Sequence, residues 1–79
     1  MNNIEKYKKA FIDSLSINKD LLSKNLEYNS IPEWDSIGHM ALMSALEEMF
    51  KINFETDDII DFSSFEKGKQ ILKKYKVNI

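Results

Sequence analysis

The stretch WDSIGHMALMSALEEMF, residues 34–50, decides the fold. Asp35 and Ser36 offer a side-chain cap, and no helix breaker follows Gly38, so the stretch predicts a helix from Ile37 to Phe50. At 100° per residue, the apolar side chains gather on an arc of roughly 160°. This arc, which we expect to face a hydrophobic core, consists of Leu42, Met43, Ala45, Leu46, Met49 and Phe50.

The opposite arc of the same helix mixes apolar and acidic side chains. It carries Ile37, Met40, Ala41, Ser44, Glu47 and Glu48. Two sizeable apolar residues, Ile37 and Met40, therefore lie away from the core and beside two acids. Such a surface is typical of a partner-binding face. A helix buried on more than one stripe, or a loop that covers Ile37, would give the same pattern.

Three further helices are predicted around this one. Apolar residues at helical spacing predict a first helix over residues 3–15: Ile4, Tyr7, Phe11 and Leu15. A brief third helix is predicted over Thr56–Asp61, with Thr56 as its cap and acids in its first turn. The capping-box pattern Ser63-x-x-Glu66 predicts a fourth helix that reaches Tyr75.

A long polar loop, residues 16–35, joins the first two helices. Scattered apolar residues should pin it to the core, with a short turn of helix near Lys19–Ser23, while Pro32 forbids helix at its own position. Trp34 is expected to anchor the end of the loop on the bundle. Residues 1–79 are thus predicted to form a single all-α domain: a four-helix bundle with a long loop between helices 1 and 2 and a short third helix.

Length and composition exclude several classes of site. A chain of 79 residues has little room for both a core and a deep catalytic cleft. The chain contains no cysteine, and a lone His39 cannot form a multi-histidine metal site, so we expect no disulfide and no metal. No run of 18 apolar residues occurs, and the N-terminal residues do not resemble a signal peptide. We therefore expect a cytoplasmic protein without membrane insertion.

Charge is divided unevenly along the chain. Residues 1–24 carry a net +2, residues 25–66 a net −9 and residues 67–79 a net +5. The basic tail contains only lysines, without arginine and without interleaved aromatic residues beyond Tyr75, so we expect no nucleic-acid partner. The acidic middle segment is the stronger signal, because a surface of one sign attracts a partner of the other.

Ser36 and His39 lie one helical turn apart, which invites comparison with a serine nucleophile and its base. Both would lie on an open surface, with no evident third member and no oxyanion hole. We therefore expect no enzymatic activity, and we interpret His39 as a solvated residue of the first helical turn.

Two segments together resemble acyl carrier proteins: Glu33–Met40, which reads EWDSIGHM, and Ala45–Phe50, which reads ALEEMF. The hallmark of that family is Asp-Ser-Leu at the start of the second of four helices, near the middle of a chain of about this length. Ile37 replaces the leucine conservatively. The resemblance extends to the turn at 57–61 and to the helix at 63–75, so it covers nearly the whole chain.

The resemblance implies that Ser36 carries 4′-phosphopantetheine, donated from coenzyme A by a phosphopantetheinyl transferase. The thiol of this arm would hold an acyl group as a thioester and present it to acyl-loading and acyl-transfer enzymes. A phosphate on a serine at a helix N-terminus would be favoured by the free N–H groups and the helix dipole. We expect a monomer that binds its partners through Asp35, Ile37, Met40, Ala41, Glu47 and Glu48.

Departures from the family pattern indicate a particular kind of carrier. Typical fatty-acid carriers have acids where Gly38 and Ala41 stand here, so the sequence is more similar to stand-alone carriers of specialised bacterial pathways. Peptidyl carriers usually have a Gly-Gly pair before the serine, which Glu33-Trp34 does not supply, and an aminoacyl or peptidyl cargo is therefore the alternative.

A different class of function remains open, that of an unmodified helical adaptor with Ser36 as a plain cap. For a carrier, we expect the bundle interior to accommodate or border the acyl chain near Met43, Met49 and Phe50, because methionine adapts to variable contents.

Overall fold

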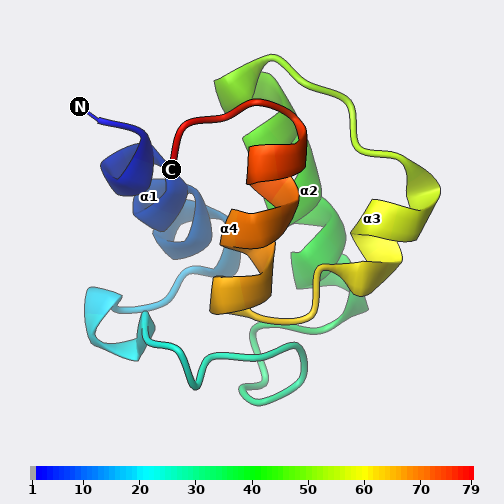
Figure 1. Ribbon diagram of the computed structural model, residues 1–79. Helices are drawn as coiled ribbons and strands as arrows, with labels where there is room; N and C mark the ends of the chain where they lie inside the picture. The colour runs from blue at the N-terminus through cyan, green and yellow to red at the C-terminus, as the bar shows by residue number, and fades with distance from the viewer. Residues whose placement is uncertain (1) are drawn as a thin grey trace.

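Four α-helices and one short 3-10 helix make up the computed structural model, which describes residues 2–79 (Figure 1). They are α1 (Asn3–Leu15), η1 (Lys19–Leu21), α2 (Ser36–Phe50), α3 (Thr56–Asp61) and α4 (Phe65–Lys74). The predicted fold is confirmed: all-α, with a long connection between the first two α-helices and a short α3. No helix within the described residues is long and apolar enough to cross a membrane.

The predicted cap of α3 is wrong. Thr56 is the first residue of the helix, and the cap position is occupied by Glu55, whose side chain makes no capping hydrogen bond. The Glu55 backbone N–H instead donates to the hydroxyl of Tyr75 at 2.9 Å. The start of α3 is therefore fixed by a contact with the end of α4, and local sequence carries no sign of that contact.

The predicted cap of α4 is displaced by one residue. Ser64, not Ser63, caps the helix, because the Ser64 Oγ accepts the N–H of Lys67 at 2.9 Å. The carbonyl of Ser63 accepts the N–H of Tyr28 at 2.8 Å, and Glu27 forms an isolated β-bridge with Ser64. This pairing with the long loop occupies Ser63, so the helix begins after it.

The core is dominated by aromatic side chains. Tyr7, Phe11, Trp34, Phe62 and Phe65 are all buried. The ring of Trp34 packs edge-on against Phe11, with centroids 5.3 Å apart, which confirms the expected anchor at the end of the loop. The predicted core arc of α2 is also confirmed, with three residues buried (Leu42, Met43, Leu46) and three partly buried (Ala45, Met49, Phe50).

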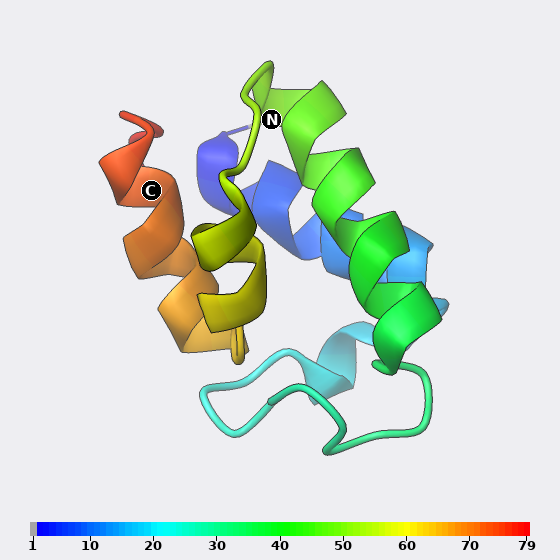
Figure 2. The same ribbon diagram turned by 90° about the vertical axis from the view of Figure 1, so that its right-hand side faces the viewer.

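A buried carboxylate ties α3 to α4, and Figure 2 shows α3 between α2 and α4. Asp58 accepts a hydrogen bond from the Lys74 ammonium at 2.6 Å and another from the hydroxyl of Tyr75. These two donors stabilise the carboxylate and hold the pKa of Asp58 below its usual range. The sequence of residues 56–61 predicts acids in the first turn of this helix but gives no sign of the contact with α4.

The contact of α1 with α4 depends on Gly68. The buried hydroxyl of Tyr7 donates to the carbonyl of Phe65 at 2.7 Å, and burial raises the pKa of this phenol. A Cβ on Gly68 would overlap both that hydroxyl and the ring of Phe62. The glycine is therefore required by the close approach of α1 and Phe62 to the backbone of α4.

We predict that Gly68→Ala destabilises the fold by about 1–3 kcal/mol through overpacking. The direction of the change in stability is informative, because helix propensity alone would make the alanine variant more stable by about 1 kcal/mol. Urea unfolding followed by circular dichroism measures the change. The control is Gln70→Ala on the exposed side of the same helix, which should leave stability nearly unchanged. A Gly68→Ala protein more stable than the wild type would contradict this packing.

Candidate functional site

Ser36 is exposed at the first position of α2, and it is not the cap of that helix. Asp35 holds the cap position with extended backbone, and its Oδ1 accepts the N–H of Gly38 at 2.8 Å. Asp35 thus confirms half of the predicted Asp35-Ser36 cap, and Ser36 as a plain cap is wrong. The Ser36 hydroxyl is therefore left without a role in helix capping.

The hydroxyl of Ser36 instead meets Tyr28, a residue that sequence analysis did not select. The two hydroxyl oxygens are 3.0 Å apart, and either can donate. Tyr28 precedes Ser36 by eight residues in the long loop, which carries no periodic pattern. Nothing in the sequence signals that the loop folds back to this serine.

Trp34, His39 and Ile59 form a hydrogen-bonded chain behind Ser36. The Trp34 Nε1–H donates to His39 Nδ1 at 2.9 Å, so the proton of the neutral imidazole is on Nε2, which donates to the carbonyl of Ile59 at 2.9 Å. His39 is buried, and the expectation of a solvated histidine is wrong because α3 packs over the first turn of α2. With both ring nitrogens engaged, His39 is not positioned to accept a proton from Ser36.

Gly38 allows the loop to pass close to the start of α2. A Cβ at this position would overlap the carbonyl oxygen of Glu33 and crowd Leu15. No larger side chain fits without a shift of the backbone. The packing of Glu33 and Leu15 against the start of α2 therefore explains why a glycine occupies position 38, independently of any partner.

An apolar cleft of about 270 Å³ is lined in part by Tyr28, the residue whose hydroxyl contacts Ser36. Its lining comes from the loop, α2, α3 and the α3–α4 connection: Tyr28, His39, Ile59, Ile60, Phe62 and Ser63. The residues expected to border an acyl chain are elsewhere, since Met43 is buried in the core and Met49 and Phe50 line a hollow at the far end of α2. Fourteen residue steps of helix, about 20 Å, separate that end from Ser36.

The predicted partner-binding residues divide into exposed and structurally engaged groups. Ile37 is 83% exposed and Met40 53% exposed, and Asp35, Ala41 and Glu48 are also on the surface. Ile60 of α3, 71% exposed, adds an apolar side chain that sequence analysis missed. The helical periodicity of α2 predicted the exposure of Ile37 and Met40. Ile60 belongs to a helix that is too short to show such a periodicity.

Glu47 does not fit the expected surface of free acids. It is partly buried, and its Oε2 accepts the backbone N–H of Phe54 at 2.8 Å. This bond secures the connection from α2 to α3. Glu48, the next residue, is exposed and remains a candidate for charge contacts.

Across residues 2–79, no group of three or more His, Cys, Asp or Glu side chains could hold a metal ion.

Comparisons with models of protein families, with curated proteins and with solved structures find no match to this chain. What the site can do therefore follows from its own geometry: an exposed serine, a tyrosine hydrogen-bonded to it, an apolar cleft lined by that tyrosine, and exposed apolar side chains on α2 and α3.

We predict that His39→Leu destabilises the fold by about 2–4 kcal/mol, because the buried indole N–H and the Ile59 carbonyl each lose a partner. Met40→Leu, an exposed substitution at the next residue, is the matched control and should change stability by less than about 0.5 kcal/mol. Both values follow from urea unfolding curves. Equal stability of His39→Leu and the wild type would show that the hydrogen-bonded chain contributes nothing.

Proposed function

We propose that this chain is an acyl carrier protein, in which Ser36 bears a 4′-phosphopantetheine arm that holds an acyl group as a thioester. The observation that carries the proposal is the state of Ser36, an exposed hydroxyl at the N-terminus of a 15-residue helix whose cap is supplied by Asp35. A serine that caps nothing is available for modification. The resemblance of the surrounding residues to carrier proteins supports the same function.

The start of α2 suits a phosphodiester. The N–H groups of Ser36 and Ile37 have no acceptor within the helix, and the dipole of α2 places positive potential at this end. In the proposed reaction, Ser36 Oγ bonds to the pantetheine phosphorus of coenzyme A while the pyrophosphate bond breaks. Adenosine 3′,5′-bisphosphate leaves, and the transferase takes the serine proton. The arm supplies the thiol, so a chain without cysteine can carry a thioester.

The cleft beside Ser36 supports an apolar cargo. Its lining includes Ile59, Ile60 and Phe62, and it adjoins Ser36 through Tyr28. An acyl chain folded back from the arm would be removed from water there. Its burial would stabilise the loaded protein by roughly 0.8 kcal/mol per methylene. An aminoacyl cargo, the alternative for a carrier, would gain little from such a lining.

Exposed side chains along α2 and α3, which we call the docking surface, support binding to partner enzymes with basic surfaces. Ile37 and Met40 of α2 and Ile60 of α3 offer apolar contact, and Glu48 offers charge. The partners we propose are a phosphopantetheinyl transferase and the enzymes that load and unload the acyl group. Because Gly38 and Ala41 replace the acids of typical fatty-acid carriers, we place this carrier in a specialised bacterial pathway.

We predict that coexpression with a broad-specificity phosphopantetheinyl transferase adds one phosphopantetheine to the wild type and none to Ser36→Ala, as measured by intact mass. Ser44→Ala, which removes an exposed hydroxyl from the same helix, is the matched control and should still be modified. Modification of Ser36→Ala would overturn the assignment of the site.

An unmodified wild type would overturn the carrier function. In that case the exposed apolar residues Ile37, Met40 and Ile60 would favour the second candidate, an unmodified adaptor that binds a partner through the same docking surface.

We predict that Glu48→Lys lowers kcat/KM of the transferase reaction about five- to tenfold at low salt and weakens its salt dependence, because exposed charges at a rim mainly accelerate encounter. The control is Glu5→Lys, which makes the same change of charge on α1. Equal effects of the two variants would show that only net charge matters, and would remove Glu48 from the docking surface.

A further inference from the structure

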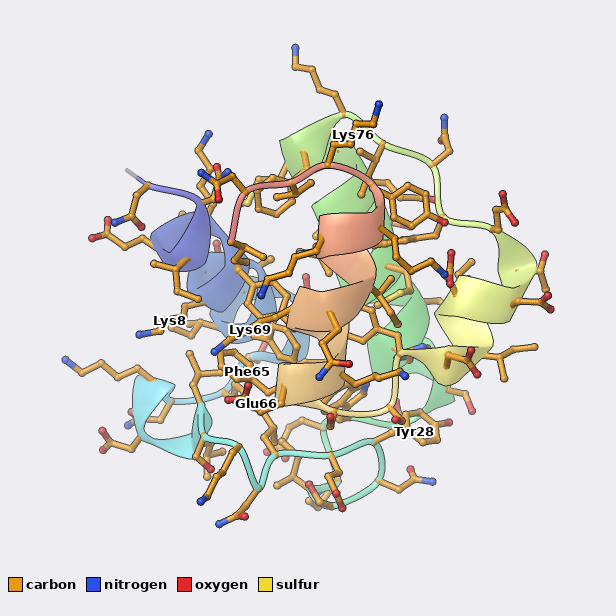
Figure 3. The ribbon with its side chains drawn as sticks, in the orientation of Figure 1. Lys8, Tyr28, Phe65, Glu66, Lys69 and Lys76 are labelled. Atoms are coloured by element: carbon orange, nitrogen blue, oxygen red, sulfur yellow. The ribbon has the colours of Figure 1, made fainter. Side chains whose placement is uncertain are left out.

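Tyr28 lies in the long loop, but its backbone is fixed on both sides. Its N–H donates to the carbonyl of Ser63 at 2.8 Å, and the N–H of Asn29 donates to the carbonyl of Trp34 at 2.9 Å. Asn29 turns the chain with a φ of 66°, a conformation that asparagine tolerates better than most residues. Figure 3 shows Tyr28 beside the connection from α3 to α4. The phenol is therefore presented from a defined position.

The phenol joins Ser36 to the apolar cleft. Its hydroxyl is 3.0 Å from Ser36 Oγ, and its ring packs edge-on against His39 with centroids 5.3 Å apart. The same ring forms part of the cleft wall, together with Ile59 and Phe62. One end of the side chain thus contacts the proposed attachment atom while its ring contacts the proposed cargo space.

We propose that Tyr28 is the positioning residue of the arm, an inference that rests on the proposed function of Ser36. Once Oγ is esterified, it has no proton to donate, and two non-bridging phosphate oxygens, which share one negative charge, lie two bonds beyond it. The phenol turns its O–H to one of these oxygens, and a hydrogen bond to a charged acceptor is roughly twice as strong as one between neutral groups. The bond holds the phosphate against the ring and directs the arm toward the cleft.

The polar side chains that flank Ser36 in the sequence already make hydrogen bonds of their own. The Trp34 N–H and both nitrogens of His39 are used in the chain that ends at Ile59. The carboxylate of Asp35 accepts the N–H of Gly38, and its negative charge would repel a phosphate. Among the side chains that contact or flank Ser36, Tyr28 therefore has the donor that is free to follow the modification.

The test compares wild type, Tyr28→Phe and Tyr75→Phe, each loaded with an arm whose two amides carry ¹⁵N. Tyr75→Phe is the matched control because it removes a phenol that bonds Asp58 and Glu55 and does not line the cleft. We expect the amide nearer the phosphate to be ordered in the wild type and in Tyr75→Phe, and mobile in Tyr28→Phe, by heteronuclear NOE.

A second readout uses an octanoyl thioester on the same arm and its cleavage by hydroxylamine. We expect cleavage to be about three- to tenfold faster in Tyr28→Phe than in wild type, since a hydrogen bond to a charged group changes an equilibrium by roughly tenfold or more. Thermal unfolding of the unloaded proteins separates positioning from structure. Tyr28→Phe should have the same melting temperature as the wild type. Tyr75→Phe should have a lower melting temperature, with the amide mobility and thioester cleavage of the arm unchanged.

The outcomes separate this inference from the function beneath it. A wild type that takes no arm would overturn the carrier function and the role of Tyr28 with it. A wild type and a Tyr28→Phe protein that both take the arm, with identical amide mobility and identical cleavage rates, would overturn the role of Tyr28 alone.

Discussion

The hydrogen-bonded chain from Trp34 through His39 to the Ile59 carbonyl is the constraint on which the rest of the site depends. A buried indole N–H or imidazole nitrogen without a partner costs about 1–3 kcal/mol. The end of the loop, the first turn of α2 and the middle of α3 therefore cannot separate without losing these bonds. Ser36 lies between Trp34 and His39 in the amino-acid sequence. Its place on the surface is therefore set by the two buried side chains on either side of it.

The same arrangement divides polar side chains into those that hold the fold and those that face outward. Asp35 caps α2, Glu47 holds the connection to α3, and Asp58 ties α3 to α4. Of these three, Asp35 was predicted as a cap, Glu47 was expected on the partner-binding surface, and the hydrogen bonds of Asp58 were not predicted. An acidic segment thus serves two purposes here: part of its charge is used in hydrogen bonds that position α2 and α3, and the remainder, such as Glu48, is left to solvent.

What faces outward around Ser36 is chemically simple. Tyr28 contacts its hydroxyl, Ile37 and Ile60 are exposed, and the cleft that Tyr28 and Ile60 help to line is mostly apolar. An arrangement of this kind has one nucleophilic hydroxyl but no base bonded to it, because His39 is engaged on both nitrogens. The proposed carrier role requires no base beside this hydroxyl, because a separate transferase would attach the arm.

Sequence alone determined the helices, the long loop, the burial of Trp34 and the exposure of Ile37 and Met40, because 3.6-residue periodicity and caps act within one or two turns of the chain. Tertiary structure alone decided that His39 is buried, that Ser64 and not Ser63 caps α4, and that Tyr28 meets Ser36. These outcomes depend on bonds such as those of Tyr28 with Ser63 and His39 with Ile59, between residues 35 and 20 positions apart. Such pairings follow from which elements pack together, and no local pattern of residues encodes them.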